Sequence, residues 1–208
     1  MNNENGRQEN TMMDDSRFAK QVRFILELDK EKTILRQTHL TGYRRQENDA
    51  EHAWHMGVMA CLLKEYANEP FDLARTLLMI LLHDVVEIDA GDTYAYDPDA
   101  VKTQREREEK AADRIFGLLP EDQAREFRDL FEEFDRGDTP EARYAHALDN
   151  FQPILLNDAN NGKDWRLHQV GRQQVEKRNA RTHEGSEKIA QAVQAIIDRN
   201  VEKGNLKP

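Results

Sequence analysis

The sequence predicts an all-α fold, a single helical bundle of about seven or eight helices. Three observations point to this fold. Apolar residues recur at helical spacing along most of the chain, residues that cap helices precede most of these stretches, and no segment alternates polar and apolar residues for long enough to form a convincing strand. The first two observations predict helices, and the third argues against a sheet.

Chain length and composition predict one domain. The 208 residues contain no linker-like stretch, and dividing them would leave two small cores. Residues 1–13 are rich in Asn and Gln and have little to bury, so we expect a disordered tail there. The domain is then expected to span residues 14–203, with a C-terminal tail at 204–208.

Capping residues, glycine and proline divide the chain into successive helices. A first helix is expected to begin after a cap among residues 14–16 and to end near residue 29. The next segment, 33–47, combines arginines with Gly42 and predicts a connecting loop rich in positive charge. Pro153 is expected to kink the helix that contains it. The remaining helices are expected at about 49–67, 72–91, 99–119, 120–134, 140–157, a short stretch from 170, and 184–202.

The charge balance disfavours some classes of partner. With 40 acidic and 30 basic residues the net charge is −10, and the basic residues are scattered, which argues against a nucleic-acid polymer or an anionic membrane. No apolar run approaches the length of about 18 residues that a membrane-spanning helix needs. The single cysteine, Cys61, is expected to be a buried small hydrophobe in a reducing compartment. We therefore expect a soluble, cytoplasmic protein.

The segment 77–93 contains the main functional signal. It reads LLMILLHDVVEIDAGDT and, as a helix, would be apolar on nearly every face, which is typical of a buried central helix. Yet it carries His83, Asp84 and Glu87, and ionisable groups occupy a dry interior only when they are paired or bound to a metal. We therefore expect a metal site in its second half.

Three separate segments supply potential ligands for one divalent ion: His52, the pair His83-Asp84, and Asp149. Two imidazoles and two carboxylates form a mixed nitrogen and oxygen set that suits Mn²⁺, Co²⁺, Mg²⁺, Fe²⁺ or Zn²⁺ and leaves positions for water and substrate. His52 can also be an ordinary helix histidine, and Asp149 a structural acid. His83 and Asp84 can form a buried ion pair, but that pairing leaves Glu87 in the same apolar helix unexplained.

The order of these residues resembles that of a known family. His52, His83-Asp84 and Asp149 follow the H…HD…D order of the HD-domain phosphohydrolases. The phrases ENDAEHAWH, LLHDVVEIDAGDTYAYD and TPEARYAHALDNFQPILLN resemble the branch that contains bacterial 5′-deoxynucleotidases, and the likeness covers most of the chain. The resemblance implies an all-helical HD domain, one divalent metal ion, commonly a homodimer, and hydrolysis of phosphomonoesters such as deoxynucleoside 5′-monophosphates.

The same resemblance implies roles for further residues. Glu87 and Asp92 match two functional acids that follow the HD aspartate, although Asp92 by itself also fits a turn. Arg36 falls in the loop that lines the phosphate site, with Arg45 as a second candidate, although both also fit ordinary surface charges. Some members carry a tryptophan soon after this arginine that helps to exclude ribonucleotides, whereas here the nearest aromatic residue is Tyr43. We therefore expect Tyr43 to pack on the sugar or base, with weaker discrimination between ribose and deoxyribose.

The predicted function is that of a metal-dependent phosphomonoesterase acting on small phosphorylated metabolites, with (deoxy)nucleoside 5′-monophosphates as the preferred class. Two alternatives stay open. One is an HD-type phosphodiesterase or pyrophosphohydrolase acting on cyclic dinucleotides or alarmones. A binuclear site of that kind usually adds histidines after the HD pair, and the next histidine here is His146. The other is a non-catalytic helical binding module whose structural metal is fully coordinated by protein.

Overall fold

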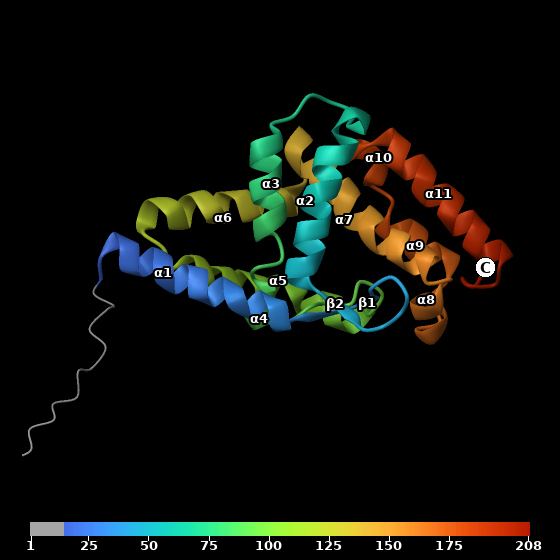
Figure 1. The fold of residues 1–208 in the computed structure, drawn as a ribbon, viewed down its shortest axis with the longest axis horizontal. Coiled ribbons are helices and arrows are strands. Elements are labelled where there is room, and N and C mark those ends of the chain that lie inside the picture. The colour runs from blue at the N-terminus through green and yellow to red at the C-terminus, as the bar shows by residue number, and fades with distance from the viewer. Residues whose placement is uncertain (1–14) are drawn as a thin grey trace, which may run out of the picture.

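The computed structural model describes residues 15–208, apart from the side chains of Pro98 and Val101, and this part of the chain is mainly helical (Figure 1). Seven of its helices have ten or more residues, in agreement with the predicted all-α bundle. The predicted tail at residues 1–13 lies outside the described residues. The elements are α1 (Arg17–Leu28), η1 (Asp29–Thr33), β1 (Leu35–His39), β2 (Gln46–Asn48), α2 (Asp49–Leu63), η2 (Lys64–Tyr66), α3 (Leu73–Leu82), α4 (Glu87–Ala90), α5 (Pro98–Phe116), α6 (Glu121–Arg136), α7 (Pro140–Ala159), α8 (Lys163–Leu167), α9 (Arg172–Arg178), α10 (Thr182–Gly185) and α11 (Glu187–Glu202).

Helix α7 forms the centre of the bundle. It packs against α2, α3, α6, α10 and α11, and Figure 1 shows it passing behind α2. Its buried residues include Tyr144, Leu148 and Asp149, and the helix continues without interruption through Pro153. The segment 77–93, which the sequence predicted to be the central helix, instead contributes α3 and α4, and α3 is one of several helices that pack around α7. Apolar residues on both α3 and α7 explain this arrangement, since each buries its apolar face against the other.

A small antiparallel hairpin corrects the prediction that residues 33–47 form a loop without strands. Strand β1 pairs with β2, with Leu35 opposite Asn48 and His39 opposite Gln46. The turn between them places Gly42 at φ 81° and Tyr43 at φ 55°. The strands are too short and too polar to show an alternating pattern, so their pairing depends on the turn and on the helices beneath them.

The predicted helix over 72–91 is broken at the residues predicted to be functional. Helix α3 ends at Leu82, His83 to Val86 form a turn, and α4 begins at Glu87. The Val85 N–H donates to Leu82 O at 3.3 Å and the Glu87 N–H donates to Asp84 O at 2.8 Å, which are contacts three residues apart and not the four of an α-helix. This tightening changes the directions of the side chains from those of a continuous helix.

Helix starts follow the sequence more closely. Asn48 caps α2 in a reciprocal pair with Glu51, and Thr139 caps α7. Helix α5, expected from about residue 99, is capped by Asp97, because Asp97 Oδ1 accepts from the backbone N–H groups of residues 99 and 100 at 2.9 and 3.1 Å. The first helix is capped by Ser16, as expected.

The last residues of the chain, expected as a tail, pack against the domain. Leu206 is 2% exposed. The Lys207 N–H donates to Val170 O at 3.2 Å, and Lys207 O accepts from the Arg172 N–H at 2.7 Å. The end of the chain therefore covers the region between α8 and α9.

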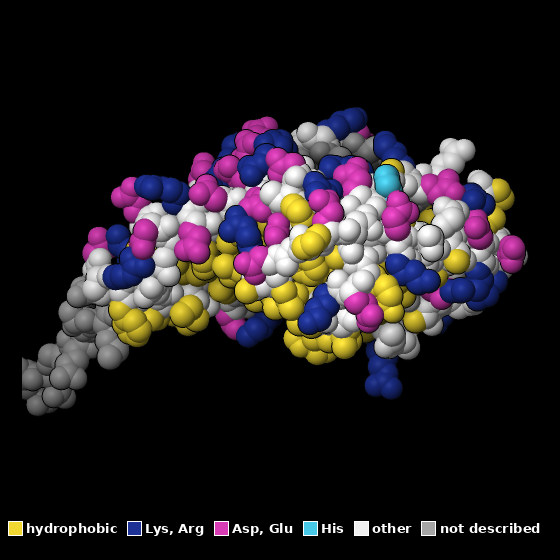
Figure 2. Space-filling model, turned by 90° about the horizontal axis from the view of Figure 1, so that it is seen from above, with side chains coloured by type: hydrophobic (Ala, Val, Ile, Leu, Met, Phe, Trp, Pro, Cys, Tyr) yellow, Lys and Arg dark blue, Asp and Glu magenta, His cyan; other side chains and the backbone are white. Residues whose placement is uncertain are grey.

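Part of the surface is apolar. Cys61, predicted to be buried, is exposed on α2, because this helix is apolar on several faces and the bundle covers only some of them. Phe18 and Ile25 on α1 are likewise exposed. Figure 2 shows hydrophobic side chains gathered along one edge of the view, beside a surface dense with acidic and basic side chains. Within residues 15–208, no helix has the length and hydropathy needed to cross a membrane.

Candidate metal centre

Two imidazoles and a carboxylate from three segments converge in the interior. The ligand atoms of His52 on α2, His83 just after α3, and Asp149 on α7 all lie within 4.8 Å of one another. His52 Nε2 lies 3.1 Å from Asp149 Oδ1, and His83 Nε2 lies 4.0 Å from the same oxygen. Asp84 Oδ2 lies 3.0 Å from His83 Nε2. The structure thus brings together the four residues that the sequence predicted as metal ligands.

Hydrogen bonds on the far side of the ring fix the orientation of His52. His52 Nδ1 lies 3.1 Å from Gln152 Oε1, and the Gln152 amide in turn donates to Glu47 Oε1 at 2.6 Å. The same amide nitrogen lies 3.1 Å from His55 Nδ1. Because an amide oxygen can only accept, Nδ1 carries the proton of this contact and Nε2 faces the converging groups. This is the arrangement that a metal-binding histidine requires.

The backbone orients His83 in the same way. His83 Nδ1 donates to Ile80 O at 2.7 Å, so Nε2 is directed to the cluster. His83 Nε2 is buried, and it faces Asp84 Oδ2 at 3.0 Å and Asp149 Oδ1 at 4.0 Å. Burial opposes a charge on the ring, but Asp84 and Asp149 outweigh this effect and raise the pKa of His83 to about 9. The site therefore favours a positive charge at Nε2, whether a proton or a cation.

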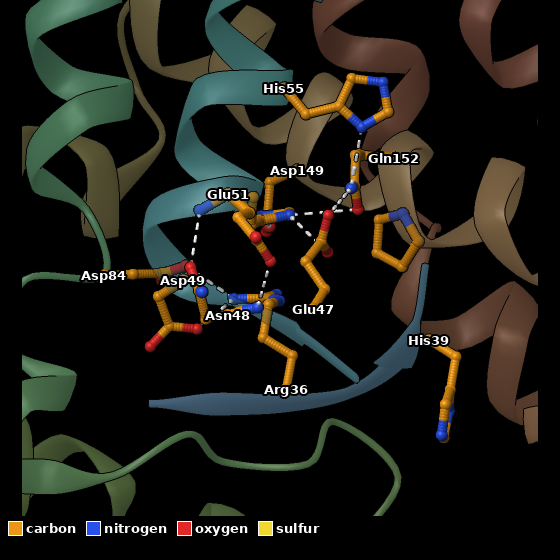
Figure 3. A network of polar contacts seen from close by, with 12 residues as sticks. Arg36, His39, Glu47, Asn48, Asp49, Glu51, His55, Asp84, Asp149 and Gln152 are labelled. Carbon is orange, nitrogen blue, oxygen red and sulfur yellow. Dashed lines mark hydrogen bonds and ion pairs between the residues drawn. The ribbon is translucent and has the colours of Figure 1, made fainter. Parts of the chain in front are cut away.

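Arg36, on β1, places its guanidinium between two acids of this site (Figure 3). Its Nη1 donates to Asp84 Oδ2 at 2.7 Å and to Asp49 Oδ1 at 3.2 Å. Burial opposes the ionised form of Asp84, yet His83 and Arg36 hold the pKa of this carboxyl well below its usual range. The side chain predicted to bind phosphate thus lies beside the predicted metal ligands.

A second group of carboxyl groups lies next to the first. Oxygen atoms of Asp49, Glu87 and Asp92 lie within 4.8 Å of one another. Burial, reinforced by the charge of Asp84, raises the pKa of Glu87 to about 11 and that of Asp49 to about 7. The structure therefore brings Glu87 and Asp92, the two predicted catalytic residues, together with an acid that the sequence did not single out.

A cavity of about 340 Å³ opens beside both groups. This volume is in the range of sites for small ligands, which begins at about 300 Å³. Arg36, Asp84, Glu87 and Asp149 form part of the wall. The remaining lining is aromatic and polar and includes Tyr94, Tyr96, Phe131, Phe134, Trp165, Asn150 and Arg178. The cavity thus combines a charged end with flat apolar surfaces.

Two predicted substrate-binding residues lie outside this cavity. Arg45 pairs with Glu51 at the start of α2, and its side chain is 55% exposed. Tyr43 stacks on His39 with ring centroids 4.1 Å apart, and Lys163 Nζ lies 4.6 Å from the centre of the Tyr43 ring. Among the described residues, neither Arg45 nor Tyr43 lines the cavity. The hairpin explains both positions, since its turn carries them away from β1 Arg36.

The sequence did not single out several residues of the site. Asp49 lies at the expected start of a helix, where an acid has a local explanation, but Asn48 makes the cap and Asp49 is fully buried against Arg36. Gln152 lies three residues after Asp149 on the same helix, a spacing that places the two on one face. Arg178 donates from Nη2 to Asp149 Oδ2 at 2.9 Å. No local pattern marks Arg178, because only the tertiary fold brings α9 to α7.

With this geometry, the sequence comparisons identify the family. Residues 28–190 match the HD domain family, and the chain belongs to it. The family predicted from the sequence is therefore confirmed.

Solved and curated relatives agree with this assignment. A crystal structure described as a predicted metal-dependent phosphohydrolase from Magnetospirillum magnetotacticum MS-1 is 48% identical, with a TM-score of 0.87, and the match covers 92% of this chain and 99% of that one. The 5′-deoxynucleotidase HDDC2 of Homo sapiens is 32% identical over 112 residues, 54% of this chain and 53% of that protein. The 5′-deoxynucleotidase hdd1 of Schizosaccharomyces pombe is 29% identical over 119 residues, 54% of this chain and 58% of that protein. The chain thus spans about half the length of the curated relatives it matches.

Proposed function

We propose that this protein is a metal-dependent phosphomonoesterase that hydrolyses (deoxy)nucleoside 5′-monophosphates. The observation that carries the proposal is the buried set of His52, His83 and Asp149 beside a cavity, with the Nε2 atoms of both rings facing carboxylate oxygens. The names of the relatives, 5′-deoxynucleotidase and metal-dependent phosphohydrolase, support the same class. A location in the cytoplasm stays a prediction.

The residues present fit a divalent metal ion. His52 and His83 each have one ring nitrogen engaged and the other facing Asp149, and Asp84 adds a second carboxylate. A divalent ion held by these four groups would polarise a phosphoryl group and make a water molecule more acidic. Its identity among Mn²⁺, Co²⁺, Mg²⁺, Fe²⁺ and Zn²⁺ is left to experiment, because nitrogen and oxygen ligands suit all of them.

Two guanidinium groups are placed to bind the phosphoryl oxygens. Arg36 and Arg178 both line the cavity and each contacts a predicted ligand, Asp84 or Asp149. A cation held by these acids would offset their charge, and Arg36 and Arg178 would then bind phosphoryl oxygens in forked geometry. Glu87 and Asp92 face the same cavity, and we propose that both serve the reaction.

The aromatic lining supports a nucleoside as the leaving group. Tyr94, Tyr96 and Trp165 offer flat surfaces on which a base can stack. No tryptophan follows Arg36, and Tyr43 lies outside the cavity, so we expect weak discrimination between ribose and deoxyribose. Metal-depleted protein should be assayed against phosphorylated metabolites, with AMP and dAMP and with CMP and dCMP, after adding each metal back. Absence of hydrolysis of every nucleotide would exclude the substrate class, and strong rejection of both ribonucleotides would contradict the weak discrimination.

The alternatives receive less support. The histidines expected for a binuclear phosphodiesterase are not in the cluster, since His146 instead bonds to Phe134 O at 2.6 Å. A purely structural metal does not explain a cavity walled by Arg36 and Glu87. Cyclic dinucleotides and alarmones belong in the same substrate panel as competing candidates.

We also propose that the protein forms a homodimer through α2. Trp54, Val58 and Leu62 repeat at intervals of four residues on its exposed side, with exposures of 68%, 40% and 69%. A helix that is apolar on several faces is normally covered on all of them. Light scattering after gel filtration should give a dimer, which Leu62→Glu should convert to a monomer. Leu167→Glu, at an equally exposed leucine on α8, is the matched control and should stay dimeric. A monomeric wild type would refute the proposal.

A further inference from the structure

A second, smaller cavity adjoins the cavity of the predicted metal centre. Its volume is about 220 Å³, and residues of α6, α7, α9 and α10 line it. Asp135, His146, Asn150 and Arg178 belong to the lining of both cavities, so the two share a wall. We call the smaller one the basic cavity.

Cationic side chains outnumber acidic ones in the wall of the basic cavity. The two acids, Asp135 and Glu184, already have partners, since Arg105 donates to Asp135 Oδ2 at 2.8 Å and Arg181 donates to Glu184 Oε2 at 2.9 Å. The cationic residues come from α7, α9 and the turn before α10, and they are Arg143, Lys177, Arg178 and Arg181. In a chain with a net charge of −10, this cavity is a local exception that favours an anion.

Some donors of this wall have no partner. The Lys177 ammonium makes no hydrogen bond or ion pair within residues 15–208. Arg143 donates from Nη1 to Asp138 O at 2.8 Å and from Nη2 to Glu69 Oε1 at 2.6 Å, which leaves unused some of the five N–H donors of a guanidinium. An anion in the cavity would find both a free ammonium and further guanidinium hydrogens.

Arg181 is held in the wall by contacts on one side of its guanidinium. Its Nε and Nη2 donate to the Glu184 carboxylate at 3.0 and 2.9 Å, and Nη2 also donates to Gly137 O at 3.1 Å. Gly137 has φ 64°, and a Cβ there would lie 3.4 Å from Arg181 Nη2 and 3.2 Å from His146 Cδ2. Glycine thus allows this close approach at the end of α6. A guanidinium that is already ordered binds an anion at a lower entropic cost.

Helix α7 places the basic cavity and the aromatic lining toward opposite ends of the predicted metal centre. Arg143, in its first turn, lines the basic cavity, and Asn157, in its last turn, lines only the larger cavity. The two positions are about 21 Å apart along the axis at 1.5 Å per residue, with Asp149 between them. Trp165 lies on α8, which follows the end of α7 and packs against it. A phosphoryl group beside Asp149 would therefore have the basic cavity on the side away from Trp165.

We propose that the basic cavity binds a second phosphate group, separate from the one that reacts at the predicted metal centre. This inference rests on the proposed phosphomonoesterase and extends it. A volume below the 300 Å³ or about that at which sites for larger ligands begin suits a small anion better than a second nucleoside. The occupant is the phosphate that hydrolysis releases, and Arg178, which lines both cavities, can contact it on either side of the shared wall. The distal phosphate of a nucleoside 5′-diphosphate has the same chemistry and is the other source.

Titration of the metal-free protein with inorganic phosphate, followed by phosphorus NMR, tests the site without any turnover. With no cation bound, the acids of the predicted metal centre repel phosphate from the larger cavity, so binding reports on the basic cavity. Lys177→Glu and Arg181→Gln should each weaken binding about tenfold or more, since each removes a charge-assisted hydrogen bond. Lys188→Glu is the matched control, because Lys188 is exposed on α11 outside both cavities, and it should bind phosphate as the wild type does. Circular dichroism verifies that each variant is folded.

Absence of phosphate binding to the metal-free wild type up to about 10 mM would overturn the proposal. Equal weakening in Lys177→Glu and Lys188→Glu would overturn it as well, because the protein would then respond only to net charge. Failure of this titration would leave the proposed phosphomonoesterase standing. A protein that binds phosphate in this way but hydrolyses no nucleotide would reject only the activity.

Kinetics of the Mn²⁺-loaded protein distinguishes the two sources of phosphate. If the cavity receives released phosphate, Lys177→Glu should leave kcat/KM for AMP unchanged and weaken inhibition by added phosphate. If it receives the distal phosphate of a diphosphate, the same variant should lower kcat/KM for ADP about tenfold and leave that for AMP unchanged. An equal loss of kcat/KM for AMP and ADP would contradict both sources and overturn the proposal.

Discussion

Two groups of side chains line the charged part of the site, and they are built differently. The histidine end comprises His52, His83 and Asp149, and the carboxylate end comprises Asp49, Glu87 and Asp92. At the histidine end, the Nδ1 atom of each ring is engaged in a hydrogen bond outside the cluster, that of His52 with Gln152 and that of His83 with the carbonyl of Ile80. At the carboxylate end, the buried carboxyl groups of Asp49 and Glu87 interact with each other through a hydrogen bond, and Arg36 Nη1 donates to Asp49 Oδ1 at 3.2 Å. Outer contacts thus orient the two rings of the histidine end, whereas the acids of the carboxylate end contact one another and Arg36.

Removing a ligand at the histidine end should have the largest effect. His52→Ala, Asp84→Ala and Asp149→Ala should each abolish activity and the ion of this site, because each removes a donor that the fold has already oriented. Elemental analysis of protein purified with Mn²⁺ measures the loss. Unchanged metal content in all three variants would show that the assignment is wrong.

Arg36 contacts acids of both ends, so its removal should have the next largest effect on activity. Arg36→Ala should lower kcat/KM by about 2–4 kcal/mol of transition-state stabilisation, since the guanidinium supports charge that develops on the phosphoryl group. Arg36→Lys should recover only part of this loss, because a point charge lacks the forked geometry. Steady-state kinetics measures both, with the exposed Arg45→Ala as control. An equal loss of kcat/KM in Arg45→Ala would show that Arg36 does not bind the substrate.

Glu87→Gln tests the carboxylate end through turnover. We expect kcat to fall by roughly 10²-fold, as for the loss of a group that acts in the transition state. The ion of the histidine site should stay, because Glu87 is not part of the His52 set. A kcat near that of the wild type would show that Glu87 has only a structural role.

Gln152→Leu tests whether the hydrogen bond from His52 Nδ1 to Gln152 contributes to metal affinity. The substitution keeps the size of the side chain but removes the acceptor at His52 Nδ1, and we expect metal affinity to fall about 10–100-fold. His55→Phe removes a different neighbour of Gln152 and should leave the affinity nearly unchanged. Isothermal titration with Mn²⁺ compares the two. Equal effects would show that general packing, and not the bond to His52, holds the site.

The pH dependence of metal-free protein should give the smallest effect. The folded pKa of His83, about 9, lies above its unfolded value of 6.5, so its charged form stabilises the fold below pH 6.5 and this contribution is lost as pH rises to about 9. The raised pKa values of Glu87 and Asp49 act in the same direction, because their ionisation is also opposed in the fold. Urea unfolding should show a decrease on the order of 1–3 kcal/mol over this range. Saturating Mn²⁺ should remove the decrease, and stability that rises with pH in its absence would contradict the account.

Local sequence determined most of the helix starts and was enough to predict most of the residues that converge in the site. Asn48, Thr139 and Ser16 cap their helices through bonds to residues at most three positions away, so neighbours alone decide these starts. The predicted ligands His83, Asp84 and Asp149 were visible because ionisable groups in apolar stretches need a partner, whereas His52 was predicted through its match to the family's residue order. The same argument did not reveal Asp49, because an acid at a helix start already has a local explanation as a cap.

Tertiary structure decided what depends on distant neighbours. The break after Leu82, the pairing of β1 with β2 and the approach of Arg178 to Asp149 each join segments that no local pattern connects. Exposure of Cys61 was likewise undetermined, because α2 is apolar on several faces and only packing selects the faces that are covered. Propensity and capping act over a few residues, whereas burial and charge pairing depend on which helices meet.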